Sequence, residues 1–167
     1  LRPEVLWGRW SGVALPGTPT VASVLSEDRE MTFGNSLFGL LRPAGASQFP
    51  AAGTVAMNYL QGEAYLKDTT AGANQVLTPA SLSQGVLQLD FNNKQFSTSL
   101  KATTPAQTIS LQAQGQINFQ GMLFSNKALS NMDVAGTLSN HANEAGYLFD
   151  ANVSPNQTLQ GATRWSR

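Results

Sequence analysis

The side-chain pattern of residues 85–100 constrains the fold of this chain more than any other feature. Apolar residues occupy alternate positions on both sides of a short polar segment, Asn92-Asn93-Lys94; they are Leu87, Leu89, Phe91, Phe96 and Leu100. A period of two places these residues on one face of an extended strand, with Gln88 and Asp90 on the other. Because asparagine tolerates left-handed backbone angles, the central segment predicts a tight turn. The pattern therefore predicts an antiparallel β-hairpin with one apolar face.

Similar short segments run through the rest of the chain. We predict further strands over residues 5–10, 35–41, 53–66 with a bend at Gly62, 109–113, 117–124, 132–138, 146–151 and 159–165. Turn residues separate them about every 8–12 positions, a spacing typical of sandwiches and barrels. We predict a long loop over 11–35 with one helical turn near 22–29, a second loop over 68–78, and a turn over 79–84.

The order of these segments favours one all-β architecture. Successive hairpins without long crossovers predict an antiparallel up-and-down β-barrel of about eight strands, similar to a lipocalin, in which closure leaves no free edge. Charged residues make up only 12% of the chain, about half the usual ~25%, and Ser, Thr, Asn and Gln replace them, as suits sheet surfaces. The chain begins at Leu1 without a Met or a signal-like segment. We therefore interpret residues 1–167 as a single barrel domain cut from a longer protein.

Charge and composition exclude several classes of function. Lys plus Arg and Asp plus Glu both total 10, so the net charge is zero, and no basic cluster is present to neutralise phosphates. Nucleic-acid binding is therefore not predicted. No apolar run approaches the ~20 residues of a membrane-spanning helix, so no transmembrane segment is predicted.

Catalytic and metal-binding patterns are equally sparse. The chain has no cysteine and one histidine, His141, which falls in a polar turn; no G-x-S-x-G nucleophile motif accompanies it. Glu63 and Asp90 are candidates for a glycosidase pair, because they lie on strands that could face each other, but the alternation directs Asp90 away from the apolar face. We predict no enzymatic activity, no cofactor and no metal ion.

Aromatic and arginine residues gather at the two ends of the chain. Trp7, Arg9 and Trp10 lie in the first predicted strand, and Arg164 and Trp165 lie in the last. If these two strands pair, arginine can stack on tryptophan, a contact worth roughly 0.5–2 kcal/mol. The interpretation we favour is a clamp that closes the barrel; the alternative is a ligand-binding or partner-binding patch.

Two sets of short motifs resemble known envelope proteins. The segment Gly85-Val86-Leu87-Gln88-Leu89-Asp90-Phe91-Asn92-Asn93-Lys94, and the segment Asn143-Glu144-Ala145-Gly146-Tyr147-Leu148-Phe149 after Gly136-Thr137-Leu138, resemble the eight-stranded barrels of transferrin-binding-type surface lipoproteins. Trp7-Gly8-Arg9-Trp10 and Ala162-Thr163-Arg164-Trp165 are more similar to the C-terminal β-barrel domain of FecR-type periplasmic proteins. These resemblances imply the periplasm or the outer-membrane surface of a Gram-negative bacterium.

The resemblance and the missing catalytic groups together favour a non-enzymatic accessory or interaction domain. In the FecR-type context its role is sensing or signalling, and its partner is another envelope protein. One alternative is a surface lipoprotein barrel that binds a host or partner protein. Another is a carrier of a small hydrophobic ligand, with Met57, Met122, Phe119 and Phe124 lining the interior.

Overall fold

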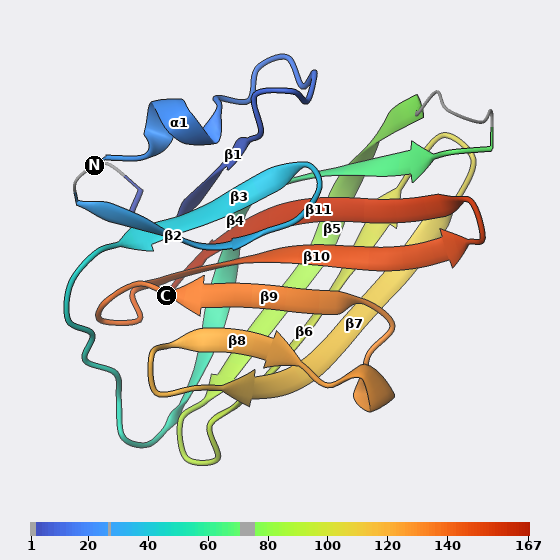
Figure 1. The fold of residues 1–167 in the computed structure, drawn as a ribbon. Helices are drawn as coiled ribbons and strands as arrows, with labels where there is room; N and C mark the ends of the chain where they lie inside the picture. Colours follow the sequence, from blue (N-terminus) through green and yellow to red (C-terminus); the bar gives the residue numbers. More distant parts are fainter. Residues whose placement is uncertain (1–2, 27, 71–75) are drawn as a thin grey trace.

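A computed structural model describes residues 3–26, 28–70 and 76–167. Two β-sheets make up the fold: a closed eight-stranded barrel and a smaller three-stranded sheet on its outside (Figure 1). Residue 27 and residues 71–75, which belong to the predicted long loop and the predicted 68–78 loop, lie outside the described ranges.

The barrel confirms the predicted all-β, antiparallel, eight-stranded architecture. Its strands follow chain order, and β11 closes the ring on β4. Each neighbouring pair in the ring is antiparallel. The strands are β4 (Thr54–Asp68), β5 (Val76–Asp90), β6 (Gln95–Thr103), β7 (Thr108–Ile117), β8 (Met122–Ser125), β9 (Asp133–Leu138), β10 (Glu144–Ser154) and β11 (Gln157–Ser166). A short 3-10 helix, η1 (Lys127–Leu129), lies between β8 and β9.

The predicted hairpin is β5–β6, with Leu89 opposite Phe96 and Asp90 opposite Gln95. Its turn is held by the Asp90 carboxylate, which accepts hydrogen bonds from the backbone N–H groups of Asn92 and Asn93. Lys94 takes the left-handed conformation, with φ 55°. The sequence prediction of this element is confirmed.

The turn predicted over 79–84 is wrong, because these residues continue β5. Pro79 pairs with Tyr65 of β4, while the pairing of β5 with β6 begins only at Ser81. A proline without an N–H is tolerated where a strand has a partner on one side only. The turn-like composition near Gln84 instead marks a bulge, where the β5–β6 register shifts and Gln84 has φ 53°.

The strand predicted over 117–124 is interrupted by a turn. The Asn118 side chain accepts hydrogen bonds from the N–H groups of Gln120 and Met122, and Gly121 has φ 76°. A Cβ at Gly121 would lie 2.3 Å from the Phe49 ring, so glycine is required there for a close contact as well as for its backbone angle.

The N-terminal segment forms the second sheet, which the sequence did not predict. Its strands are β1 (Leu6–Arg9), β2 (Arg29–Gly34) and β3 (Phe38–Pro43), in the order β1-β3-β2, and a four-residue helix, α1 (Val21–Val24), follows β1. The prediction that residues 5–10 form a barrel strand is therefore wrong, and the predicted loop over 11–35 contains β2. A register shift between Met31 and Phe33 breaks the alternation of β2, which explains why its sequence did not suggest a strand.

The barrel interior is filled by large side chains. Trp165, Tyr147, Phe91 and Phe149 are all at most 1% exposed. The Trp165 ring stacks on Tyr147 with centroids 5.9 Å apart and meets Tyr59 edge-on at 5.3 Å. Their polar atoms are paired: the Trp165 indole N–H donates to Thr163 Oγ1 at 2.7 Å, and the Tyr147 hydroxyl lies 2.8 Å from Thr98 Oγ1. A satisfied, closely packed core of this kind stabilises the ring by itself.

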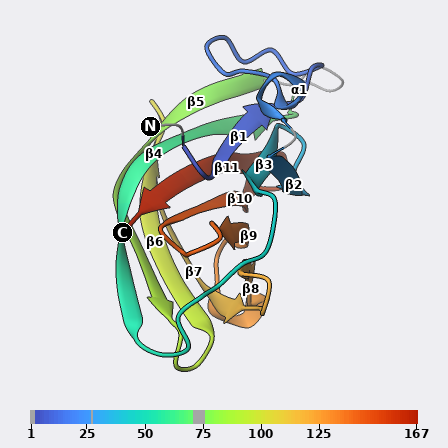
Figure 2. The ribbon, with the colours of Figure 1, turned by 90° about the vertical axis from the view of Figure 1, so that its left-hand side faces the viewer.

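The small sheet packs against the outer face of the barrel. Leu148 of β10 and Ala162 of β11 point outward and are covered by β1 and β3 residues, forming a second buried cluster with Val5, Trp7, Leu15, Leu37, Phe38 and Leu40. Figure 2 shows the small sheet beside β10 and β11, outside the ring. Outward apolar residues are therefore buried at one place on the barrel wall. In the part of the chain that the structure describes, no helix has the length and apolar character needed to cross a membrane.

Candidate functional site

The line of contact between the two sheets leaves an open cleft of about 320 Å³, which we call the junction cleft. Its lining comes from the N-terminal segment, β4 and β11; the residues are Pro3, Leu6, Trp7, Gly17, Thr18, Pro19, Gln61, Glu63 and Arg164. Two residues of the predicted terminal patch, Trp7 and Arg164, are among them. A hollow with a few convergent polar groups is the usual form of a binding site.

Glu63 is the best-anchored side chain of the cleft. Its carboxylate accepts hydrogen bonds from the Trp7 indole N–H at 2.5 Å, from the Thr18 hydroxyl at 2.9 and 3.1 Å, and from the Tyr65 hydroxyl at 3.2 Å. The pKa of the Tyr65 hydroxyl is raised, first by burial and then by the negative charge of Glu63 and their hydrogen bond. Three neutral donors therefore fix the position of the Glu63 carboxylate.

Arg164 lies on the same cleft but is already paired. Its Nη1 donates to Gln61 Oε1 at 3.2 Å, and its Nε lies 3.6 Å from Glu144 Oε1. By contrast, no lysine, arginine or histidine forms a salt bridge with Glu63 among residues 3–26, 28–70 and 76–167. Arg164 thus lies within ion-pair distance of a carboxylate, whereas in the described part of the chain the partners of Glu63 are all neutral donors.

Arg9 holds the loop that supplies Thr18. Its guanidinium donates to the backbone carbonyl of Thr18 from Nε at 3.0 Å and to that of Val13 from Nη1 at 3.0 Å. Arg9 therefore helps to position Thr18 against Glu63.

The predicted barrel clamp does not exist in this structure. β11 pairs with β4 and β10, whereas β1 pairs with β3, so the first and last strands do not meet. Trp165 lies inside the barrel with 0% exposure, and the Trp10 indole N–H donates to the Asn35 carbonyl at 2.7 Å. Adjacent residues on a strand point to opposite faces, so Arg164 and Trp165 could not have shared a surface.

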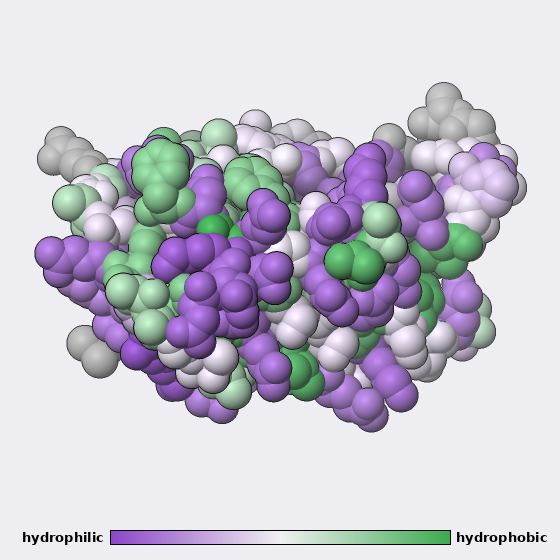
Figure 3. All heavy atoms as spheres, turned by 90° about the horizontal axis from the view of Figure 1, so that it is seen from below, coloured by the Kyte–Doolittle hydropathy of each residue, from purple (hydrophilic) through white to green (hydrophobic). Residues whose placement is uncertain are grey.

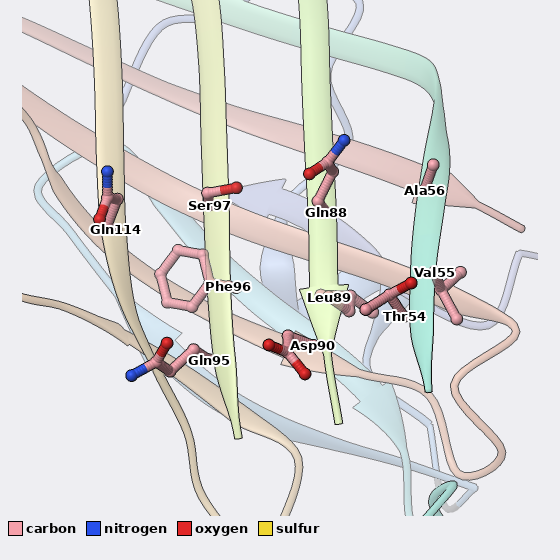
Figure 4. A pocket seen from close by; sticks show the side chains of 10 residues that line it. All are labelled: Thr54, Val55, Ala56, Gln88, Leu89, Asp90, Gln95, Phe96, Ser97 and Gln114. Atoms are coloured by element: carbon pink, nitrogen blue, oxygen red, sulfur yellow. The ribbon is translucent and has the colours of Figure 1, made fainter. Parts of the chain in front are cut away.

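A second hollow, about 350 Å³, lies over the outer wall of β4–β7 (Figure 4). Amide and hydroxyl side chains alternate with apolar ones along its lining, and its one carboxylate is Asp90. That carboxylate is occupied by the Asn92 and Asn93 turn, whose hydrogen bonds lower its pKa, the Asn93 side chain contributing most. This hollow therefore offers no anchored charge to a ligand.

The glycosidase pair considered from the sequence is not formed. Asp90 pairs with Thr54, nine positions from Glu63 along β4, which is roughly 30 Å along an extended strand. His141, the only histidine of the chain, lies in an exposed turn between β9 and β10.

Three of the four residues expected to line a carrier cavity lie outside the barrel core. Phe119 is 89% exposed, Phe124 is 44% exposed, and Met122 is only partly buried. Met57 is 6% exposed and belongs to the core. The surface in Figure 3 is largely hydrophilic, with small separate hydrophobic patches. Neither the interior packing nor this surface favours a hydrophobic ligand.

The sequence analysis missed the central role of Glu63, and it did not single out Thr18 or Gln61. The available signal was the position of Glu63 in β4: it lies between Gly62 and the inward-facing Ala64, and so points out of the barrel. What covers that outward position depends on the small sheet, which the sequence did not predict.

Comparison with solved structures identifies a barrel of the same fold. A doubly substituted form of transferrin-binding protein B from Haemophilus parasuis, described as a vaccine antigen, aligns with a TM-score of 0.51 at 13% identity, over 78% of this chain and 29% of that chain. The fold is shared with transferrin-binding protein B. A singly substituted form gives 0.50 at 15% identity, over 78% and 30%. This chain thus spans less than a third of the length of those proteins. No protein-family model and no curated protein matches the sequence.

Proposed function

We propose that this chain is a non-enzymatic, protein-binding barrel of a Gram-negative cell-envelope protein, and that the partner binds at the junction cleft. The observation that carries the proposal is the carboxylate of Glu63, held by Trp7, Thr18 and Tyr65 at the wall of an open cleft. A few fixed polar groups among apolar residues are typical of a binding pocket.

The shared fold also supports a protein partner. The neighbours are named for the binding of transferrin, a protein, which favours a surface barrel with a protein partner over a carrier of small molecules. Fold alone does not carry function, so the proposal depends on the cleft. A FecR-type sensing role is a finer hypothesis that rests on the motifs around Trp7 and Arg164.

Site-specific photo-crosslinking in the native envelope tests the proposal. A photoreactive amino acid is placed at Gln61 or Pro19, on the rim of the junction cleft, and at Gln112 on β7 as a control; all three positions are exposed. We expect a crosslinked protein of defined mass from the cleft positions and not from Gln112. Equal crosslinking from all three positions, or none from the cleft in cells that retain the folded protein, would contradict the proposal.

A further inference from the structure

Among the residues that the structure describes, the Glu63 carboxylate of the junction cleft has no cationic partner. Its hydrogen-bond donors within those residues are Trp7, Thr18 and Tyr65, all of them neutral. Arg164 lies on the same cleft, but Glu144 at 3.6 Å and Gln61 at 3.2 Å already engage its guanidinium. A cleft with a matched cation and an unmatched anion attracts positive charge.

Hydrogen bonds hold the Glu63 carboxylate in one orientation. The Trp7 indole N–H donates to Oε1, the Tyr65 hydroxyl donates to Oε2, and the Thr18 hydroxyl lies within hydrogen-bond distance of both oxygens. These donors use part of the hydrogen-bond acceptor capacity of the carboxylate. The directions of its remaining lone pairs are fixed, because the plane of the carboxylate is fixed. The geometry is therefore set before a ligand arrives, which lowers the entropic cost of binding.

The remaining walls suit a side chain with an apolar stem. Pro3, Leu6 and Pro19 line the cleft together with the charged and polar groups. The volume of about 320 Å³ is at the small end of the range for ligand pockets, which suits one side chain of a partner. Lysine and arginine both carry a methylene stem that packs on apolar surface while the charged head reaches a polar group.

We propose that the junction cleft binds a basic side chain, lysine or arginine, of a partner protein, with Glu63 as its counter-charge. This inference rests on the proposed protein-binding function and specifies the chemistry of the partner segment. Glu63 acts as the binding residue, whereas Trp7, Thr18 and Tyr65 position its carboxylate. Gln61 adds an amide oxygen beside it, already shared with Arg164.

The test uses capped pentapeptides, Gly-Ser-X-Ser-Gly, in which X is lysine, arginine, norleucine or glutamate. Nuclear magnetic resonance follows the Trp7 indole N–H, which donates directly to Glu63 and is one of only three indole groups in the chain. We expect saturable shifts of this resonance with the lysine or the arginine peptide. Norleucine, which keeps the stem and loses the charge, and glutamate should bind at least about tenfold more weakly.

Three variants test the role of charge in peptide binding. Glu63→Gln keeps an oxygen acceptor for Trp7 and Thr18 but removes the charge, and should weaken the basic peptides at least about tenfold. Asp90→Asn removes a carboxylate from the outer hollow and should leave binding unchanged. Arg164→Gln removes a positive charge from the lining of the same cleft, which lowers the repulsion of an incoming basic side chain, and should strengthen binding by several-fold; this variant tests the proposal even if Glu63→Gln fails to fold.

The outcomes distinguish this inference from the proposed function. Equal binding of lysine and norleucine peptides, no saturable shift with either basic peptide, or unchanged binding in a folded Glu63→Gln protein would overturn the basic-side-chain proposal. If crosslinks still form at Gln61 in that case, protein binding at the cleft stands without this specificity. If peptides bind as expected but no crosslink forms, the cleft chemistry stands and the proposed protein partner does not.

Discussion

The barrel interior and the junction cleft are both built around tryptophan, but they use it in opposite ways. Inside the ring, Trp165 is fully buried, stacks on Tyr147, and satisfies its N–H with Thr163. At the junction, Trp7 is buried and lines the cleft, and its indole N–H donates a hydrogen bond to the Glu63 carboxylate. In the barrel interior, therefore, the buried polar groups form hydrogen bonds with one another. In the junction cleft, by contrast, the hydrogen bonds hold a carboxylate that faces an open cleft.

Replacing Trp165 tests the self-contained region and should have the largest effect. Trp165→Ala removes a fully buried ring that contacts Tyr147 and Tyr59, and we expect a loss of about 3–5 kcal/mol in the free energy of unfolding, measured by urea denaturation. Trp10→Ala is the control, because Trp10 is only partly buried and lies outside the barrel. An equal loss in the two variants would contradict the view that the ring is the main source of stability.

Replacing Leu148 tests whether the small sheet depends on the barrel wall. Leu148→Ala leaves a cavity where an outward-facing residue packs under β1 and β3, and should cost about 2–3 kcal/mol. Hydrogen exchange should show faster exchange of β1 and β3 amides while β5 and β6 amides remain protected. Uniform loss of protection in both sheets would instead mean that they unfold as one unit.

A methyl group at Gly8 should disturb the cleft specifically. A Cβ at this position would lie 2.7 Å from the Val21 nitrogen and 2.8 Å from the Thr20 carbonyl carbon, so the segment that also carries Thr18 must move. We expect Gly8→Ala to cost roughly 1–3 kcal/mol and to shift the Trp7 indole resonance.

Gly12→Ala provides the matched control for that change. A Cβ at Gly12 would meet nothing within 4 Å, and its φ is not in the left-handed region. It should leave the Trp7 resonance and the melting temperature essentially unchanged. A similar resonance shift in both variants would show that the cleft does not depend on close approach at Gly8.

The smallest effect concerns Asp150 on the outer wall of β10. Burial raises the pKa of its carboxyl; the Gln160 side chain lowers it by less, and nearby Asp133 adds to the rise. Its Oδ1 is buried without a hydrogen-bond partner in the described part of the chain. A raised folded-state pKa means that the folded protein binds the proton more tightly, so stability falls as pH rises through that pKa. Asp150→Asn should therefore give a small rise in melting temperature at neutral pH that disappears at acidic pH.

Asp90→Asn should behave with the opposite sign. Hydrogen bonds from Asn93 and Asn92 lower the pKa of Asp90, so its contribution is present above the unfolded-state pKa and is lost as pH falls through the folded-state value. The variant should be slightly less stable than the parent at neutral pH and should match it in acid. Melting curves across pH check both variants: a fall in stability for Asp150→Asn at neutral pH, or a rise for Asp90→Asn, would contradict the corresponding assignment.

The sequence prediction succeeded where only one face of a strand is buried, because alternating apolar residues then mark that face. At Leu87, Leu89 and Phe96 an apolar side chain points into the ring, and the strands and hairpin were predicted correctly. At Leu148 and Ala162 the outward face is also buried, and alternation gives no sign of this. The prediction for Trp165 failed for a simpler reason, since neighbouring residues of a strand face opposite ways and Arg164 occupies the outer face.

By itself, the sequence determined the antiparallel barrel, because period-two alternation and turn residues act locally and leave few ways to bury one face of each strand. Only the tertiary structure decided that residues 6–9 join β2 and β3 outside the ring and place Trp7 and Thr18 against Glu63. Contacts between segments more than forty residues apart depend on which surfaces remain uncovered after the barrel closes. These contacts therefore cannot be predicted from any single segment of the sequence.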